Sequence, residues 1–335
     1  MNNSRLPIIV TTITPQRISF AGGGTDILSF SRDFDGAVLS STIDKYIYVT
    51  VKQHSPLFGE SYRLSYFKTE HANSLDEIEN EIIRECLRLV PVSPPLYIST
   101  TADVPASSGL GSSSSFAVGI LNALHAMRGE IVSPGQLAEE ACRVEINILN
   151  KPIGKQDQYA AAFGGLNFIT FNKNGRVTID QITLPENGVN NLFDNLMLVW
   201  TGVQRDAGEI LKEQLIKADI NKESLYKIRE LAFELRDKIL DHPVCIKQFG
   251  EILHKSWIAK QKLSTTVSNS KIDELYEKAL NLGCYGGKLA GAGGGGFILL
   301  VAPPFIQKKI QNEFNFFGAI KIKHEPLGSR IIFKM

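Results

Sequence analysis

The amino-acid sequence predicts an α+β protein, with helices and sheets in two layers, divided into two domains. Three observations lead to this prediction. Strand-like segments dominate up to about residue 105, strongly helical segments follow residue 220, and 335 residues with 43% hydrophobic content are enough for two cores. We expect the domains at 1–190 and 191–335, packed closely because no Pro/Ser-rich linker separates them.

The first 105 residues carry most of the predicted strands. Runs rich in β-branched and aromatic residues, bounded by turn residues, predict strands at 8–14, 17–21, 37–51, 62–67 and 96–102. One helix interrupts them over residues 75–90, where apolar side chains recur at spacings of three and four. This part of the chain is therefore predicted to be β-rich.

Helices are predicted in both domains. One follows the serine run at 112–115 and ends at Gly129, and another begins at Ser133 and continues to about residue 149. In the second domain, a strand at 196–201 precedes helices at 223–240, 244–263 and 272–282, a glycine-rich loop and a strand at 297–301.

Charge and composition exclude several classes of partner. The 36 Lys and Arg residues nearly cancel the 35 Asp and Glu residues, so no overall field draws the chain to nucleic acid or to an anionic membrane. No apolar stretch approaches the length of a membrane span, and no signal-peptide core is present. We therefore expect a cytoplasmic location. The four cysteines lack paired spacing, so we expect reduced structural thiols.

The most informative segment is residues 103–117, where a glycine and serine loop leads directly into an apolar helix. A helix start presents unpaired backbone N–H groups and partial positive charge, so it can hold a polyphosphate. Gly109 and Gly111 allow the backbone to approach closely, and the hydroxyls at 112–115 can bind a phosphate or magnesium. The segment predicts a nucleotide-using enzyme.

A second candidate loop has three adjacent glycines at 22–24, followed by Thr25 and Asp26. Three glycines weaken any regular element, so we expect a ligand to approach the backbone here; the alternative is a plain turn. Thr25 and Asp26 are expected to face a hydroxylated substrate, and Arg17 is expected to project from the preceding strand toward an anion.

Two acidic residues that follow the serine loop in the sequence are further candidates for the site. Glu145 lies on the border of a buried helical stripe without a basic partner one turn away, so it either reaches solvent or meets a cation. Asp157 begins a short helix, where an acidic residue either caps the helix or acts as an acid or base. An acid near a magnesium carboxylate and a phosphate loop favours phosphoryl transfer to a hydroxyl.

A third glycine-rich loop, at 288–297, precedes an apolar strand. Five glycines in six residues favour a loop that closes over bound phosphates or over the other domain, rather than a simple hairpin connection. Arg205 also follows a strand, and it either meets a substrate anion or is a surface charge.

Together these motifs resemble the GHMP kinase superfamily, which includes galactokinase, homoserine kinase and mevalonate kinase. The resemblance covers nearly the whole chain. It rests on Pro15-Gln16-Arg17 in the first strand, on the C-terminal glycine loop, and on the central Pro105-Ala106-Ser107-Ser108-Gly109-Leu110-Gly111-Ser112-Ser113. It implies an N-terminal domain like the second domain of ribosomal protein S5 and a C-terminal ferredoxin-like domain.

The resemblance also implies roles for single residues. Ser113 and Glu145 match the family's magnesium ligands, and Asp157 matches the acid that accepts the proton of the substrate hydroxyl. Arg17 matches a basic residue that stabilises the transferring charge, and Lys155 either shares this role or helps to hold an anionic substrate. The implied ATP-binding residues are Pro105, Ser108, Gly109, Leu110, Gly111, Ser112, Ser113 and Ser114, and the implied substrate-binding residues are Gly23, Gly24, Thr25, Asp26, Arg205, Gly293 and Gly294.

Within the superfamily, residues 22–26 and the Thr201-Gly202 pair with Arg205 are similar to the branch that phosphorylates the anomeric hydroxyl of D-glycero-D-manno-heptose 7-phosphate. This similarity implies ATP, Mg²⁺ and a sugar phosphate as the small molecules bound, and it leaves a homodimer open. Two alternatives remain: a kinase of a neutral sugar such as L-fucose, and a non-catalytic sugar sensor. The presence of Ser113, Glu145 and Asp157 disfavours the sensor.

Overall fold

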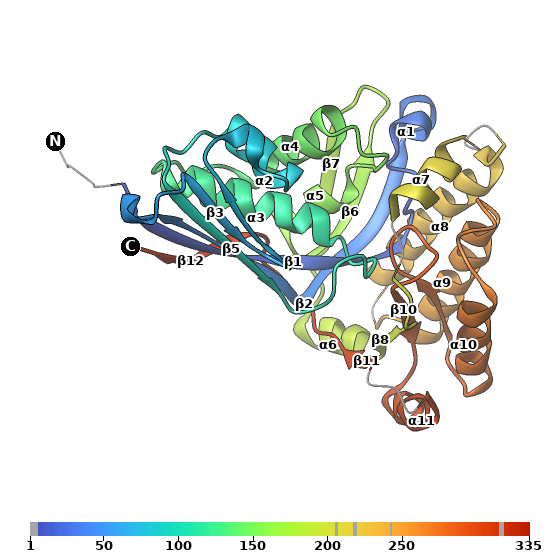
Figure 1. Cartoon of the computed structure of the whole chain (residues 1–335). Helices are drawn as coiled ribbons and strands as arrows, with labels where there is room; N and C mark the ends of the chain where they lie inside the picture. Colours follow the sequence, from blue (N-terminus) through green and yellow to red (C-terminus); the bar gives the residue numbers. More distant parts are fainter. Residues whose placement is uncertain (1–5, 205–206, 217–219, 242, 315–317) are drawn as a thin grey trace.

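Two β-sheets organise the chain, and each carries its own helices (Figure 1). The computed structural model describes residues 6–204, 207–216, 220–241, 243–314 and 318–335. The strands are β1 (Ile9–Ala21), β2 (Gly36–Gln53), β3 (Tyr62–Ser65), β4 (Thr69–Ala72), β5 (Leu96–Ala102), β6 (Leu166–Phe171), β7 (Val177–Gln181), β8 (Leu196–Trp200), β9 (Gly286–Leu289), β10 (Phe297–Val301), β11 (Ala319–Lys321) and β12 (Arg330–Lys334). The α-helices are α1 (Leu28–Phe34), α2 (Glu81–Leu89), α3 (Ser112–Met127), α4 (Pro134–Cys142), α5 (Gln156–Phe163), α6 (Glu186–Asp194), α7 (Ala207–Ile216), α8 (Lys222–Leu240), α9 (Ile246–Gln261), α10 (Ser270–Asn281) and α11 (Pro304–Phe314).

The larger sheet has eight strands, and its long strand β2 holds it together. Residues 36–41 of β2 pair with β6, residues 47–53 pair with β5, and β1 runs antiparallel along most of its length. Helices α2 to α5 bury their apolar stripes against one face of this sheet and form the first core. We call this sheet with its helices the first lobe, and the four-stranded sheet with helices α8 to α11 the second lobe. The opposite face of β1, β2 and β6 packs against the second lobe.

The smaller sheet has four antiparallel strands in the order β11-β8-β10-β9. In chain order this is fourth, first, third and second strand, with helices after the first and third, which is the ferredoxin-like arrangement. The predicted α+β class and the ferredoxin-like second domain are therefore confirmed.

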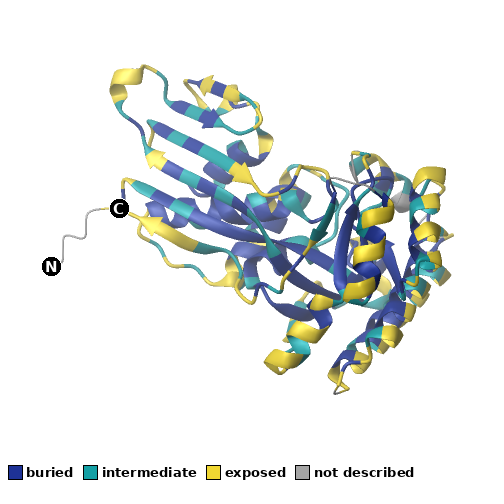
Figure 2. Ribbon diagram, turned by 90° about the horizontal axis from the view of Figure 1, so that it is seen from below, coloured by how far each residue is buried: buried dark blue, intermediate teal, exposed yellow. Residues whose placement is uncertain are grey.

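A second core joins the two lobes. Apolar residues of β1, β2 and β6 pack there against α8, α9 and the inner face of the small sheet. The rings of Phe20 in β1 and Phe249 in α9 meet edge to face, with 5.1 Å between their centroids. Figure 2 shows the resulting pattern, with buried strands at the centre and exposed residues on the outward faces of the helices. The two sheets are thus packed closely through a shared core.

Strand β12 crosses back to the first lobe. It pairs with β1, and the Ile8 N–H donates to the carbonyl of Met335 at 2.7 Å. The division of the chain at residue 190 stays a prediction; the strands change sheet between β7 and β8, and the last strand belongs to the sheet of the first lobe.

Two predicted elements differ from the observed ones for local reasons. The strands expected at 8–14 and 17–21 form one strand, β1, whose pairing with β2 shifts between Pro15 and Gln16, because proline cannot donate to the ladder. The helix expected over 75–90 begins only at Glu81, where the Asn80 side chain accepts the Ile83 N–H at 3.1 Å. Among the described residues, no helix has both the length and the apolar character needed to cross a membrane.

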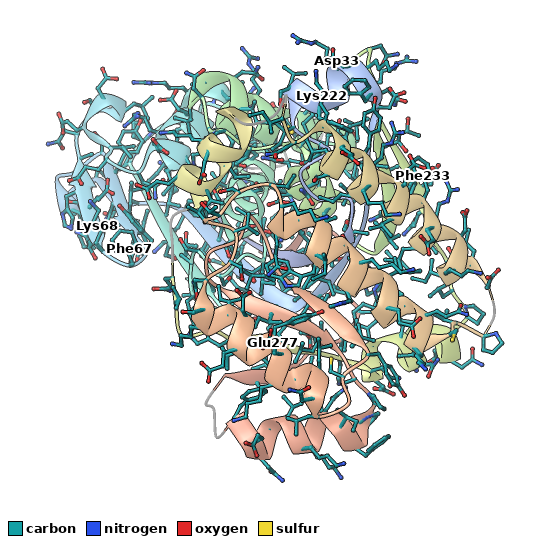
Figure 3. All side chains as sticks on the ribbon, turned by 90° about the vertical axis from the view of Figure 1, so that its right-hand side faces the viewer. Asp33, Phe67, Lys68, Lys222, Phe233 and Glu277 are labelled. Carbon is teal, nitrogen blue, oxygen red and sulfur yellow. The ribbon has the colours of Figure 1, made fainter. Side chains whose placement is uncertain are left out.

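The shared core predicts that Phe249→Ala destabilises the protein strongly. Phe249 is 1% exposed, so its truncation leaves a cavity between the lobes and should lower the free energy of unfolding by about 3–5 kcal/mol. Phe67 is 91% exposed at the edge of the first lobe (Figure 3), so Phe67→Ala is the matched control and should change it by less than about 0.5 kcal/mol. Urea unfolding measures both; equal losses would contradict this packing.

Candidate active site

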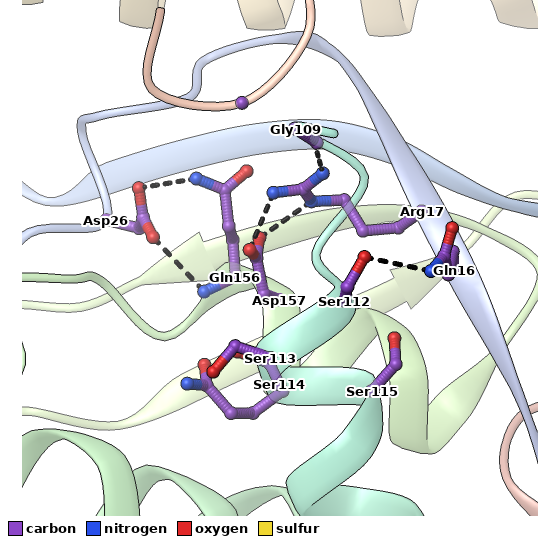
Figure 4. Close-up of polar contacts among 12 residues, drawn as sticks. Gln16, Arg17, Asp26, Gly109, Ser112, Ser113, Ser114, Ser115, Gln156 and Asp157 are labelled. Carbon is purple, nitrogen blue, oxygen red and sulfur yellow. Dashed lines mark hydrogen bonds and ion pairs between the residues drawn. The ribbon is translucent and has the colours of Figure 1, made fainter. Parts of the chain in front are cut away.

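The loop before α3 is fastened to β1, and this contact places the start of the helix. Gly109 and Gly111 have φ angles of +84° and +79°, which other residues rarely adopt, and Gly111 is the N-cap of α3. The Gln16 side-chain amide donates to the Ser112 hydroxyl at 2.9 Å (Figure 4). The Ser115 hydroxyl donates to the Pro15 carbonyl at 2.9 Å. These contacts therefore hold the predicted phosphate loop and the start of α3 against β1.

Glu145 comes to the start of α3 by way of a π-helical segment. Helix α4 ends at Cys142 and the chain continues as a π-helix over Arg143–Ile148, so the helix predicted to run to about 149 changes type around Glu145. The Glu145 carboxylate is fully buried and accepts hydrogen bonds from Ser113 (2.5 Å), Ser114 (2.7 Å) and Gln158 (2.7 Å). The side chain thus turns inward, and the structure brings Ser113 and Glu145 together as predicted.

Asp157 faces the same loop from the first turn of α5. The Arg17 guanidinium donates two parallel hydrogen bonds to its carboxylate, at 2.7 and 2.6 Å, and a third to the Gly109 carbonyl at 2.7 Å (Figure 4). A Cβ atom placed on Gly111 would lie 3.4 Å from Asp157 Oδ2. Lys155, not Asp157, is the N-cap of α5. The capping alternative is therefore set aside.

Asp26 forms a second buried carboxylate close to Asp157. It accepts hydrogen bonds from the Gly24 N–H (3.0 Å), the Gln156 N–H (3.1 Å) and the Gln156 side-chain amide (2.9 Å). A Cβ atom on Gly154 would lie 2.0 Å from Asp26 Oδ2, so only glycine allows this approach. Burial, and then the negative charge of Asp157, raise the pKa of Asp26 above its ordinary value.

Thr25 and Lys155 lie differently from what the sequence suggested. Thr25 is fully buried; its hydroxyl donates to the Gly22 carbonyl at 2.8 Å and accepts the Ala37 N–H at 3.0 Å, so it fastens the loop instead of facing a substrate. The Lys155 ammonium lies 3.4 Å from a carboxylate oxygen of Glu139, and no contact with Asp157 is recorded in the described part of the chain. Arg205 lies outside the described residues.

The third glycine loop closes on the phosphate loop. A Cβ atom on Gly291 would lie 2.6 Å from the Gly109 Cα atom, and one on Gly296 would lie 2.4 Å from the Ser108 carbonyl oxygen. The Phe297 N–H also donates to that carbonyl, at 3.1 Å. Of the two sequence interpretations, contact with the other domain is therefore the one observed.

Three further predicted residues, Leu110, Gly293 and Gly294, make contacts within the protein that hold these loops in place. The Leu110 side chain is fully buried in the core between the lobes, and its carbonyl accepts the Arg17 N–H at 3.0 Å. The Gly294 N–H donates to the Val267 carbonyl at 2.8 Å, and Gly293 packs on the same residue. Pro105 is exposed at the entrance of the loop.

Sequence reasoning missed Lys260, which reaches the site from α9. Its side chain is 6% exposed, and its ammonium donates to the Gly291 carbonyl. Burial, and then the positive charge of Arg17, lower the pKa of Lys260 to about 8. A signal was present: Lys260 continues the buried stripe of Phe249 and Leu253 at helical spacing, and a lysine on such a stripe is unusual.

The chain is similar to known proteins over both lobes. The model of the GHMP kinases N terminal domain matches residues 77–165, and that of the GHMP kinases C terminal domain matches 244–320. A D-glycero-alpha-D-manno-heptose 7-phosphate kinase of Campylobacter jejuni is 32% identical, covering 88% of this chain and 90% of that protein. A galactokinase of Pyrococcus furiosus is 26% identical, covering 86% and 87%. A crystal structure of a D-glycero-D-manno-heptose 1-phosphate kinase from Bacteroides thetaiotaomicron superposes with a TM-score of 0.79 at 25% identity, covering 97% and 99%.

The burial of Lys260 predicts a specific pH dependence of stability. Between about pH 8 and the ordinary lysine value of 10.5, the folded protein has released this proton while the unfolded chain still holds it, so stability from this group rises with pH. Lys260→Met removes the effect. Its stability advantage over the wild type should therefore narrow between about pH 7.5 and about pH 9.5 in urea unfolding.

The matched control is Lys255→Met, which changes an exposed lysine on the same helix. Its stability curve should run parallel to that of the wild type. A Lys260→Met curve that also runs parallel would mean that the ammonium is not buried in the folded protein.

Proposed function

The chain belongs to the GHMP kinases, and we propose that it transfers the γ-phosphate of ATP to the anomeric hydroxyl of D-glycero-D-manno-heptose 7-phosphate, giving the 1,7-bisphosphate. It is a phosphotransferase with an alcohol group as acceptor. One observation carries the proposal: the Arg17–Asp157 pair and the Ser113–Glu145 pair meet the same short segment, the loop that leads into α3.

Asp157 is the proposed base. The acceptor hydroxyl would give its proton to the Asp157 carboxylate while its oxygen forms the new bond to the γ-phosphorus and the bond to the ADP oxygen breaks. The bidentate contact with Arg17 fixes the direction of this carboxylate, and the Gly109 carbonyl in turn fixes the guanidinium. Arg17 would also stabilise the negative charge of the group in transfer, because it is a permanent cation beside the reacting atoms.

The residues at the start of α3 fit a magnesium ion. Mg²⁺ is commonly bound through one or two carboxylates together with substrate phosphates, and Glu145 and Ser113 supply one carboxylate and one hydroxyl oxygen. Ser113 is exposed, so its hydroxyl can leave Glu145 and turn to a ligand. When bound, the ion would neutralise phosphate charge, and Ser113 and Glu145 would hold it beside the loop.

The choice of acceptor rests on the relatives. Two of the three similar proteins are named as kinases of a manno-heptose phosphate, and one of these is 32% identical over most of the chain. The galactokinase of Pyrococcus furiosus keeps a neutral sugar as the second candidate. The two candidates differ in whether the site must accept a phosphate that is already on the sugar.

Asp157→Asn should lower turnover by about 10²- to 10⁴-fold while ATP binding is retained, because the amide cannot accept the hydroxyl proton. ADP release in a coupled assay measures turnover, and calorimetric titration with a non-hydrolysable ATP analogue measures binding. Asp180→Asn, on exposed strand β7, is the control and should leave both unchanged. Full turnover by Asp157→Asn would refute its role as the base.

The acceptor is tested with purified wild-type protein, ATP and Mg²⁺. We expect D-glycero-D-manno-heptose 7-phosphate to be converted with a kcat/KM at least about a hundredfold above those for L-fucose and galactose, the ratio that recognition of one charged group supplies. Phosphorus NMR of the product should show a new anomeric phosphate. Turnover of a neutral sugar alone would overturn the heptose assignment and leave the kinase assignment in place.

A further inference from the structure

Two buried lysines approach the candidate site from the second lobe. Lys260 is 6% exposed and Lys288, on β9, is 3% exposed. Lys260 donates to the Gly291 carbonyl, and for Lys288 no hydrogen bond or ion pair is recorded within the described ranges. Lysine is rarely buried without a partner, because an ammonium group loses its hydration there. The two side chains therefore need an explanation beyond packing.

Lys288 faces the first lobe. It lies opposite Leu299 in the antiparallel pair of β9 and β10, and residues opposite each other project to the same face of a sheet. Leu299 belongs to the core between the lobes. The positive charges of Lys260 and Arg17 act on Lys288 and, together with burial, lower its pKa well below the ordinary value. Three basic side chains thus gather where the lobes meet, and their charged forms repel one another.

The carboxylates around these basic side chains are already bound to other groups. Asp26 and Asp157 are the negative charges that act on Lys260. Asp157 already accepts hydrogen bonds from Nε and Nη2 of Arg17, and Asp26 accepts them from Gln156 and Gly24. No ion pair between either lysine and a carboxylate is recorded in the described chain. A ligand that brings negative charge would complete the cluster.

The position of the cluster favours the acceptor over the nucleotide. Lys260 contacts the glycine loop where Gly291 meets Gly109, and Gly109 is also the residue whose carbonyl binds Arg17, the partner of the proposed base. Glu145, the candidate magnesium ligand, has a different lysine beside it, Lys151, at 3.9 Å. The two lysines therefore belong to the side of the site that the sugar would occupy.

We propose that Lys260 and Lys288 bind a phosphate group carried by the acceptor sugar, so that the site selects phosphorylated over neutral sugars. The proposal rests on the proposed kinase function, and it deepens that function by assigning the residues that recognise the acceptor. A bound phosphate would give both ammonium groups charged partners in a buried setting, where such hydrogen bonds are strong.

The test is a binding measurement without ATP, so that it does not depend on phosphoryl transfer. Calorimetric titration compares D-glycero-D-manno-heptose 7-phosphate, D-mannose 6-phosphate and unphosphorylated D-glycero-D-manno-heptose. We expect Lys260→Met and Lys288→Met each to weaken binding of the sugar phosphates by about thirtyfold or more, as loss of one partner of a buried charge pair does. Affinity for the neutral heptose and for an ATP analogue should not change, and Lys255→Met should behave as wild type.

A second readout separates ligand binding from a structural role. Lys288→Met should raise the Tm of the protein without ligand, because it replaces a buried, desolvated amine by an apolar side chain of similar volume. Lys260→Arg and Lys288→Arg keep the charge, and they should retain most of the preference for sugar phosphates. They also serve as the test for either position where the methionine variant does not fold.

Several outcomes would overturn the proposal. These are equal affinity of the wild type for heptose and its 7-phosphate, weaker binding of the ATP analogue instead of the sugar, or a lower Tm with unchanged sugar binding. Lysine-dependent binding of D-mannose 6-phosphate without heptose turnover would support the phosphate site while refuting the heptose kinase. Heptose turnover with unchanged sugar-phosphate binding in both lysine variants would support the heptose kinase and refute the phosphate site.

Discussion

The Arg17 guanidinium is the contact on which the candidate site depends. It projects from β1, binds the Asp157 carboxylate through two hydrogen bonds, and binds the Gly109 carbonyl through a third. Strand β1 also accepts a bond from Ser115 in α3, so the first strand fixes both the phosphate loop and the acid. A charge-assisted bidentate pair has a narrowly defined geometry, so it fixes the Asp157 carboxylate relative to β1 and Gly109.

The second constraint is the close contact of the glycine loops between the lobes. Gly291 and Gly109 approach so closely that a Cβ atom on Gly291 would collide with the opposite backbone. Phe20 and Phe249 pack in the core between the lobes, and the same core includes Leu110 and Ala290, which lie next to the two glycine loops' contact. The apolar core thus holds the lobes together, and the polar residues next to it are partly desolvated. Desolvation strengthens the electrostatic interactions of Asp26, Asp157 and the buried lysines.

The sequence pattern predicted an element correctly where neighbouring residues alone decide its conformation. Strands β5 and β10 have the predicted bounds, because a short β-branched run bounded by turn residues decides them. Strand β12 was not predicted, since its partner β1 lies more than 300 residues earlier in the chain and its own residues are half exposed. The π-helical turn at Glu145 has no counterpart in the sequence pattern, because it follows from the contacts of the carboxylate with α3 and α5.

The sequence alone determined which chemistry the chain carries: a serine-bearing helix start at Ser113, acids at Glu145 and Asp157, and glycines where the backbone must come close. Only the tertiary structure decided how these groups face one another. It turned Thr25 into the loop, directed Lys155 to Glu139, and brought Lys260 beside Arg17. The physical reason is that residue type and spacing set local conformation, whereas the direction of a side chain and its electrostatic partners depend on packing between segments far apart in the chain.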